Sequence, residues 1–172
     1  MCQKAIEDVD GDELFDTHET PTELSESLPY TNAVLKEIQR ITNVPPVGIA
    51  HRAVRDAELM GYSIPRDTII LTSLFSVHMD PKIWGDPYTF RPERFLGEEG
   101  KTIGERSFLP FGYGKRQCLG ISLAKASYFL FFTSLLYHFD LEKIPEGPLP
   151  NVQGFDGLTL SPKPFKMKLN PR

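Results

Sequence analysis

The sequence is poor in features that would assign it to several common classes of protein. Only two of its 172 residues are cysteines, Cys2 and Cys118, and their wide separation gives no disulfide framework, so a reducing compartment is expected. No apolar run reaches the roughly 18 to 20 residues of a membrane span, because the longest, residues 128–139, contains polar side chains. The first residues also lack the apolar stretch of a signal peptide. We therefore expect neither a leader nor a membrane anchor within this chain.

The composition is that of one ordinary globular domain. Apolar residues make up 40% of the chain and charged residues 24%, which is typical of a protein with a hydrophobic core. The net charge of −4 argues against nucleic acid as the main partner. Acidic residues gather in 7–26 and basic residues in 101–125. We interpret the acidic stretch as solvated surface.

One glycine-rich stretch, residues 111–120, stands out from this background. It reads FGYGKRQCLG and is followed at once by the apolar run 122–139. This order predicts a tight turn that leads into a helix, with Cys118 at the helix N-terminus. Backbone amides and the helix dipole favour an anion there, so we expect Cys118 to be held as a thiolate, the form that binds metals.

Several other interpretations of this stretch are possible. A lone cysteine is most often a small buried hydrophobic residue. A dinucleotide-binding turn is excluded because Gln117 stands where the third glycine is needed, and no phosphate-loop motif is present. No second cysteine lies near enough for a zinc site. A site with a single thiolate remains, and it suits haem iron, with Arg116 able to pair with a propionate.

Three motifs in the right order resemble those of the cytochrome P-450 family. FGYGKRQCLG matches the family's haem-binding signature F-x-x-G-x-R-x-C-x-G. Upstream, Glu37 to Arg40 matches E-x-x-R, and RPERF at 91–95 matches the P-E-R-F segment. The resemblance covers nearly all of residues 1–172, but only about the C-terminal third of a typical family member. It implies a partial P-450 domain of mixed α/β class, mostly helical with small β-sheets.

The expected elements follow the order of that domain. An exposed loop at 10–27 precedes the E-x-x-R helix at 32–40, which Thr31 or Asn32 caps and which residues 44–46 end. Next come a small antiparallel sheet, a short helix at 74–79, a packed meander and the cysteine loop. The chain then forms a long buried helix at 119–139 and a C-terminal hairpin. The sheet strands are expected within 47–54 and at 58–60, 62–64 and 68–72, and the hairpin strands at 152–160 and 165–169.

The resemblance also assigns roles to individual residues. Cys118 becomes the axial ligand of haem iron, and no catalytic residue of the family's acidic/threonine pair has a counterpart here. The remaining cofactor-binding residues are Arg116, His51, Phe111, Gly112 and Gly120. The structural triad is Glu37, Arg40 and Arg94, with an exposed surface pair worth about 0.5 kcal/mol as the alternative for the first two. For His51, a purely structural role is as well supported. The substrate-lining candidates are Val47, Ile49 and Phe155.

The function implied by the resemblance is that of a haem-thiolate monooxygenase. Such an enzyme uses haem b to insert one oxygen atom of O2 into a lipophilic substrate, with electrons from NADPH through a flavoprotein reductase. Steroids, fatty acids and xenobiotics all remain compatible as substrates. Localisation at the cytoplasmic face of the endoplasmic reticulum membrane is expected, although a mitochondrial member is equally compatible with these residues. The alternative is a truncated, non-catalytic product with weak or no haem binding, and we expect the 172 residues alone to be inactive.

Overall fold

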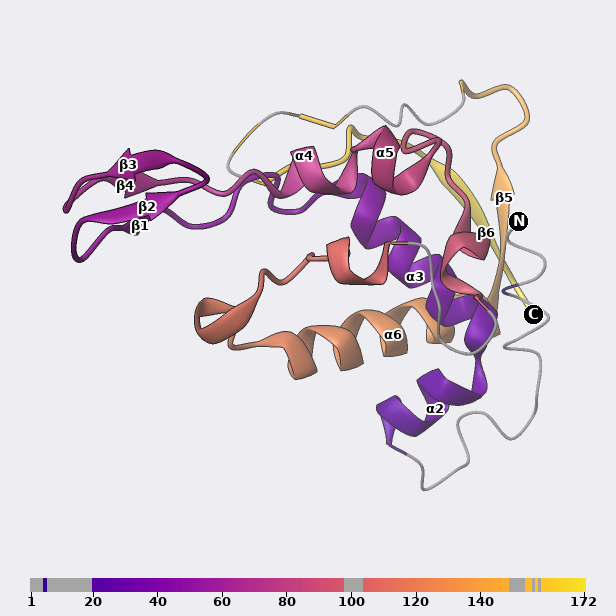
Figure 1. Cartoon of the computed structure of the whole chain (residues 1–172). Helices are drawn as coiled ribbons and strands as arrows, with labels where there is room; N and C mark the ends of the chain where they lie inside the picture. Colours follow the sequence, from indigo (N-terminus) through magenta and orange to yellow (C-terminus); the bar gives the residue numbers. More distant parts are fainter. Residues whose placement is uncertain (1–4, 6–19, 98–103, 149–153, 156, 158) are drawn as a thin grey trace.

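Helix α3 (Pro29–Thr42) runs through the middle of the molecule (Figure 1). The structure is a computed structural model that describes residues 5, 20–97, 104–148, 154–155, 157 and 159–172. The predicted helix exists but begins earlier than expected, because Pro29 occupies its first turn, where a missing N–H is harmless. Thr31 and Asn32 therefore lie inside the helix and do not cap it. The helix ends at Asn43, whose φ of 46° lies in the left-handed region, just before the prolines.

A short helix, α2 (Pro21–Ser27), occupies part of the predicted loop at 10–27, so that part of the prediction is wrong. Thr20 and Glu23 form a capping box, in which the Thr20 amide donates to the Glu23 carboxylate at 2.7 Å and the Thr20 hydroxyl accepts from the Glu23 amide. Pro21 stands at the first helical position, where it favours a helix instead of breaking it. Residues 10–19 lie outside the described part of the chain.

The long helix α6 (Ile121–His138) follows the cysteine loop and packs on α2 and α3. Leu24, Leu35 and Phe129 form one apolar cluster between the three helices, and Leu136 joins a second cluster on α3. The helix is apolar nearly all round, as predicted, but it is buried on one side only. Leu123 and Phe131 are largely exposed, because α2 and α3 cover only one face.

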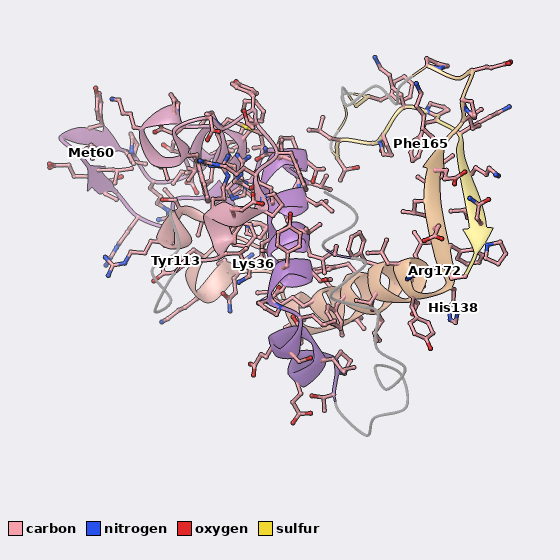
Figure 2. All side chains as sticks on the ribbon, turned by 90° about the vertical axis from the view of Figure 1, so that its right-hand side faces the viewer. Lys36, Met60, Tyr113, His138, Phe165 and Arg172 are labelled. Atoms are coloured by element: carbon pink, nitrogen blue, oxygen red, sulfur yellow. The ribbon has the colours of Figure 1, made fainter. Side chains whose placement is uncertain are left out.

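The predicted antiparallel sheet is present as two separate two-stranded ladders. Strand β1 (His51–Arg52) pairs with β4 (Ile69–Ile70), and β2 (Ala57–Leu59) pairs with β3 (Tyr62–Ile64). The ladders project from the helical body at one end of the molecule (Figure 1). Met60, in the turn between β2 and β3, is almost fully exposed and lies far from the C-terminal strand (Figure 2).

The C-terminal strand pairs differently from the prediction. Strand β6 (Met167–Pro171) is antiparallel to β5 (Phe139–Lys143), which directly follows α6, and Leu141 stands opposite Leu169. The predicted partner strand at 152–160 is wrong in its described part, where only an isolated bridge joins Phe155 to Ser161. His138 and Arg172 meet at the end of this ladder (Figure 2), where the Arg172 amide donates to the His138 carbonyl at 3.0 Å.

Short helices and turns connect the ladders to the cysteine loop. Helix α4 (Leu74–His78) matches the predicted short helix, and α5 (Pro81–Trp84) adds one turn that the sequence did not indicate. The 3₁₀ helices η1 (Pro92–Phe95), η3 (Glu105–Ser107) and η4 (Gly114–Arg116) follow. Trp84 and Phe95 pack with Ala33 of α3 in a third apolar cluster, so this segment is packed, as its aromatic residues predicted.

Candidate functional site

Two arginines converge on one buried carboxylate. Glu37 and Arg40 lie one turn apart on α3, and both side chains are 0% exposed. The Arg40 Nε and a terminal nitrogen donate to the two Glu37 oxygens at 2.7 and 2.9 Å. Arg94 of η1 donates from Nε to Glu37 Oε1 at 3.2 Å, and the Arg91 amide donates to the same oxygen at 2.9 Å. The alternative of an exposed Glu37–Arg40 surface pair is therefore wrong.

The guanidinium groups of Arg40 and Arg94 also hold the meander, residues 80–97, against α3. Arg40 donates to the carbonyls of His78 and Pro87, and Arg94 donates to those of Trp84, Asp86 and Thr89, at 2.7 to 3.2 Å. The Arg40 guanidinium carbon lies 5.2 Å from the centre of the Trp84 ring, within cation–π range. A segment without regular ladders is thus fixed by side-chain donors that satisfy its backbone.

A partly exposed carboxylate closes the outer side of this cluster. Asp86 Oδ1 accepts from Arg91 at 2.7 Å and from Arg94 at 3.2 Å. Burial alone would raise the pKa of Asp86. Hydrogen bonds from its own backbone amide and from Arg94, together with the charges of Arg94 and Arg91, outweigh that effect and lower the pKa. Asp86 is therefore ionised at neutral pH, opposite two arginines.

Two buried residues that the sequence did not single out, His78 and Asn43, join α3 to the segment before the cysteine loop. His78 Nδ1 lies 3.0 Å from Asn43 Oδ1, and the Leu109 amide donates to His78 Nε2 at 2.9 Å. Burial, and then the charge of Arg40, lower the pKa of His78 from 6.5 to about 4. His78 is therefore neutral at physiological pH. No periodic pattern or motif in the sequence links these positions.

The cysteine loop is a tight turn, as predicted, and it leads into α6. Gly112 and Gly114 have φ of 75° and 76°, values that favour glycine. The Cys118 amide donates to the Phe111 carbonyl at 2.9 Å and so closes the loop. Gly120 is the N-cap of α6, two residues after the cysteine. Cys118 is a free, exposed thiol, so the interpretation as a small buried hydrophobic residue is wrong.

The structure brings some of the predicted site residues together and leaves others apart. Cys118 and Arg116 share one loop, together with the predicted residues Phe111, Gly112 and Gly120, and Arg116 is exposed. His51 lies outside that loop, on the exposed strand β1. The substrate-lining candidates are separated in the chain and exposed: Val47 bridges to Ser73, Ile49 precedes β1, and Phe155 bridges to Ser161.

The loop offers a thiol, exposed apolar side chains and a cation, which suit a cofactor that is apolar and carries anionic groups. Leu119, beside the thiol, is fully exposed, and Leu123 on the next turn is 74% exposed. A Cβ built on Gly114 or Gly120 would meet no atom within 4 Å, so a ligand can approach the backbone closely there. Among the described residues, no three His, Cys, Asp or Glu side chains are grouped to hold a metal ion. The donor set is thus one thiol, apolar surface and the Arg116 cation.

Comparison with known proteins identifies the family. The family model described as Cytochrome P450 matches residues 1–169. Human cytochrome P450 2U1 is 44% identical over 145 residues, which are 84% of this chain and 27% of that protein. The farnesoate epoxidase of Bombyx mori is 46% identical over 143 residues, 83% of this chain and 29% of that protein. The chain belongs to the cytochrome P450 family.

The solved structures agree with this assignment. A zebra fish cytochrome P450 solved with abiraterone superposes with a TM-score of 0.85 and 37% sequence identity, covering 99% of this chain and 39% of that one. The chain spans less than a third of the length of the human P450 2U1 and of the Bombyx mori epoxidase. The mixed helical and small-sheet architecture is therefore the P450 fold over this portion. Within the described residues, no helix is both long enough and apolar enough to cross a membrane.

Proposed function

We propose that Cys118 is the axial thiolate ligand of haem b iron in a haem-thiolate monooxygenase. The observation that carries this proposal is the exposed thiol of Cys118, held by the hydrogen bond from its amide to Phe111 within open apolar surface. Haem b bound through a thiolate supplies the chemistry that inserts one oxygen atom of O2 into an organic substrate and reduces the other to water. The family to which the chain belongs supports this chemistry.

The residues of this chain orient and hold the cofactor. Gly120 leaves the backbone open beside the sulfur, Gly112 adopts the positive φ that the turn needs, and Phe111 fixes the loop through its carbonyl. Arg116 would pair with a haem propionate through a charge-assisted hydrogen bond, and His51 on strand β1 would donate to a propionate. The buried cluster of Glu37, Arg40 and Arg94 is too enclosed to touch a ligand. Its role is to hold the meander that precedes the loop.

The proposed function also implies an electron donor, a substrate and a cellular location. An NADPH-dependent flavoprotein reductase docks on the face near the cysteine loop, where Lys115, Arg106 and Lys125 are exposed. A small lipophilic substrate contacts Val47, Ile49 and Phe155, all of which have exposed apolar side chains. The enzyme works at the cytoplasmic face of the endoplasmic reticulum membrane, a location that rests on the resemblance of its motifs to microsomal members of the family.

The 172 residues by themselves are proposed to be inactive. Cys118 and Leu119 are open to solvent, and a site open to water does not protect reactive intermediates. Purified 172-residue chain, mixed with reductase, NADPH and haem, should therefore show no substrate-dependent oxygen consumption. Turnover by this chain alone would contradict the proposal.

Replacing Cys118 tests the ligand assignment. The variant C118S is compared with C2S, which removes the other cysteine of the sequence, in the natural product of the gene at the length its transcript encodes. We expect C118S to lose the absorption spectrum of thiolate-ligated haem and all oxygen insertion, whereas C2S keeps both. A C118S protein that retains the thiolate spectrum would refute the assignment.

A further inference from the structure

The imidazole of His78 uses both of its nitrogens to connect three segments of the chain. Its side chain is almost fully buried, with a residue exposure of 1%. The Leu109 amide can only donate, so His78 Nε2 is the acceptor of that 2.9 Å hydrogen bond and the ring proton sits on Nδ1. Nδ1–H then donates to Asn43 Oδ1 at 3.0 Å. The Asn43 amide nitrogen donates to the Arg40 carbonyl at 2.8 Å, which fixes its oxygen toward His78.

One end of this connection is anchored in the buried cluster around Glu37. Asn43 ends α3 in the left-handed conformation and is itself 1% exposed. Arg40, which pairs with Glu37, donates to the His78 carbonyl at 2.8 Å. His78 is therefore held at both its side chain and its backbone by groups from the last turn of α3.

The other end leads in two short steps to the cysteine. Leu109, whose amide donates to His78, also accepts a hydrogen bond at its carbonyl from the Gly112 amide at 3.0 Å. The carbonyl of Phe111, inside that turn, receives the Cys118 amide at 2.9 Å. A continuous series of hydrogen bonds thus runs from the end of α3 through His78 to the residue that carries the thiol.

We propose that His78 is a positioning residue that fixes where the cysteine loop leaves the body of the protein and so sets the position of the Cys118 sulfur. The proposal rests on the proposed role of Cys118 as haem ligand. His78 does not touch the ligand; it acts through Leu109 and Phe111. This series of hydrogen bonds, called the His78 link below, requires the neutral imidazole. A proton on Nε2 would make that nitrogen a donor, and it could no longer accept from the Leu109 N–H.

The surroundings of His78 keep it in this neutral form. The charged groups that face it come from α3 and η1: Arg40 contacts its carbonyl, and Glu37 and Arg94 lie directly behind Arg40. Asn43 and residues 108–111 contribute only neutral groups, including the Phe108 ring at 6.0 Å from the imidazole centre. Burial and the Arg40 charge both lower the pKa of His78, so the link is intact at neutral pH and fails when acid protonates the imidazole.

The first test measures the link without haem. Amide hydrogen exchange at Leu109 and Cys118 is followed in the natural gene product and in H78F. This variant keeps an aromatic ring at the position but removes the hydrogen bonds to Asn43 and Leu109. The control L136A creates a cavity in α6, where Leu136 packs on α3 away from the loop. After correction for global stability, we expect exchange at both amides to rise about tenfold in H78F but not in L136A. Equal exchange in the two variants would overturn the proposal.

The second test measures a pH dependence, with L136A again as the control for general destabilisation. The variant N43D places a carboxylate on His78 Nδ1–H and so favours the charged imidazole. With haem supplied, the fraction of thiolate-ligated haem is measured against pH from the absorption of its reduced carbon-monoxide complex. We expect the acid midpoint of thiolate ligation to move up by about one pH unit in N43D, and an unchanged midpoint would overturn the proposal. If the natural protein binds haem without a sulfur ligand, the function fails, and the exchange experiment still decides the role of His78.

Discussion

Replacing Glu37 with glutamine removes a negative charge from a site where four donors converge. In E37Q the amide oxygen can keep the three bonds now made by Oε1, but its NH2 group then faces Arg40 Nε, which at present donates to Oε2 at 2.7 Å. Arg40 would remain buried, with a side chain that is 0% exposed, and would have no carboxylate partner. Arg94 would keep only the partly exposed Asp86.

The expected loss of stability follows from that geometry. Removing one partner of a buried ion pair costs about 3–5 kcal/mol, because the remaining charge is neither paired nor hydrated. A domain has only about 5–15 kcal/mol of unfolding free energy in total. We therefore expect E37Q to be folded only marginally at 25 °C and to release the meander from α3.

Urea denaturation of E37Q, followed by circular dichroism, measures this loss. The control E58Q changes an exposed glutamate on β2 and should stay within about 0.5 kcal/mol of the parent protein. A loss below about 1 kcal/mol in E37Q, at an unchanged denaturant slope, would show that the buried cluster does not hold the meander against α3.

Two further predictions concern the packing of the meander and the pH dependence of stability. A Cβ at Gly104 would lie 2.8 Å from the Trp84 ring, at a φ of 74°, so G104A should lose about 2 kcal/mol of unfolding free energy in urea denaturation. The control G48A meets only ordinary contacts at 3.6 Å and should lose less. Equal losses in the two variants would contradict the contact with Trp84. The pKa of His78 falls from 6.5 to about 4 on folding. Between these two pH values the unfolded chain therefore binds a proton that the folded protein does not. The unfolding free energy should keep its full value above pH 6.5 and fall by about 3 kcal/mol as the pH drops to 4. The variant H51Q, which changes an exposed histidine, should keep this pH slope and H78F should lose it; the same slope in all three proteins would assign it to other groups.

Local patterns in the sequence predicted those elements whose residues supply their own signals. The apolar face of α3 and the prolines after it located the helix and its end, and 74–79 was found because its apolar residues stand between turn signals. The start of α3 was misplaced because Pro29, and not a polar side-chain cap, begins it. Helix α2 was missed because Pro21 and the acidic composition outweighed the Thr20-x-x-Glu23 signal, which could have revealed it.

Features set by contacts between distant segments could not be predicted in the same way. The partner of β6 lies directly after α6 and is selected by where that helix ends, which no local pattern encodes. The burial of α6 was overestimated because its apolar residues face all directions, while the described part of the chain, chiefly α2 and α3, leaves side chains such as Leu123 and Phe131 exposed.

The candidate site divides along the same line. Cys118 stood out because it lies in a glycine-rich loop, whereas Glu37, Arg40 and Arg94 were identified through motifs that resemble those of the family. His78 bonds to residues 35 and 31 positions away in the chain, and its neighbours in sequence give no sign of that role. Its function depends on burial and on the geometry of Asn43, which only the folded structure defines.

X-ray absorption at the iron edge of the haem-loaded gene product identifies the atoms that bind the iron. We expect one sulfur ligand to iron in the natural protein and in C2S, and no sulfur ligand in C118S. Haem iron bound without sulfur in the natural protein, or sulfur ligation that survives in C118S, would contradict the assignment of Cys118.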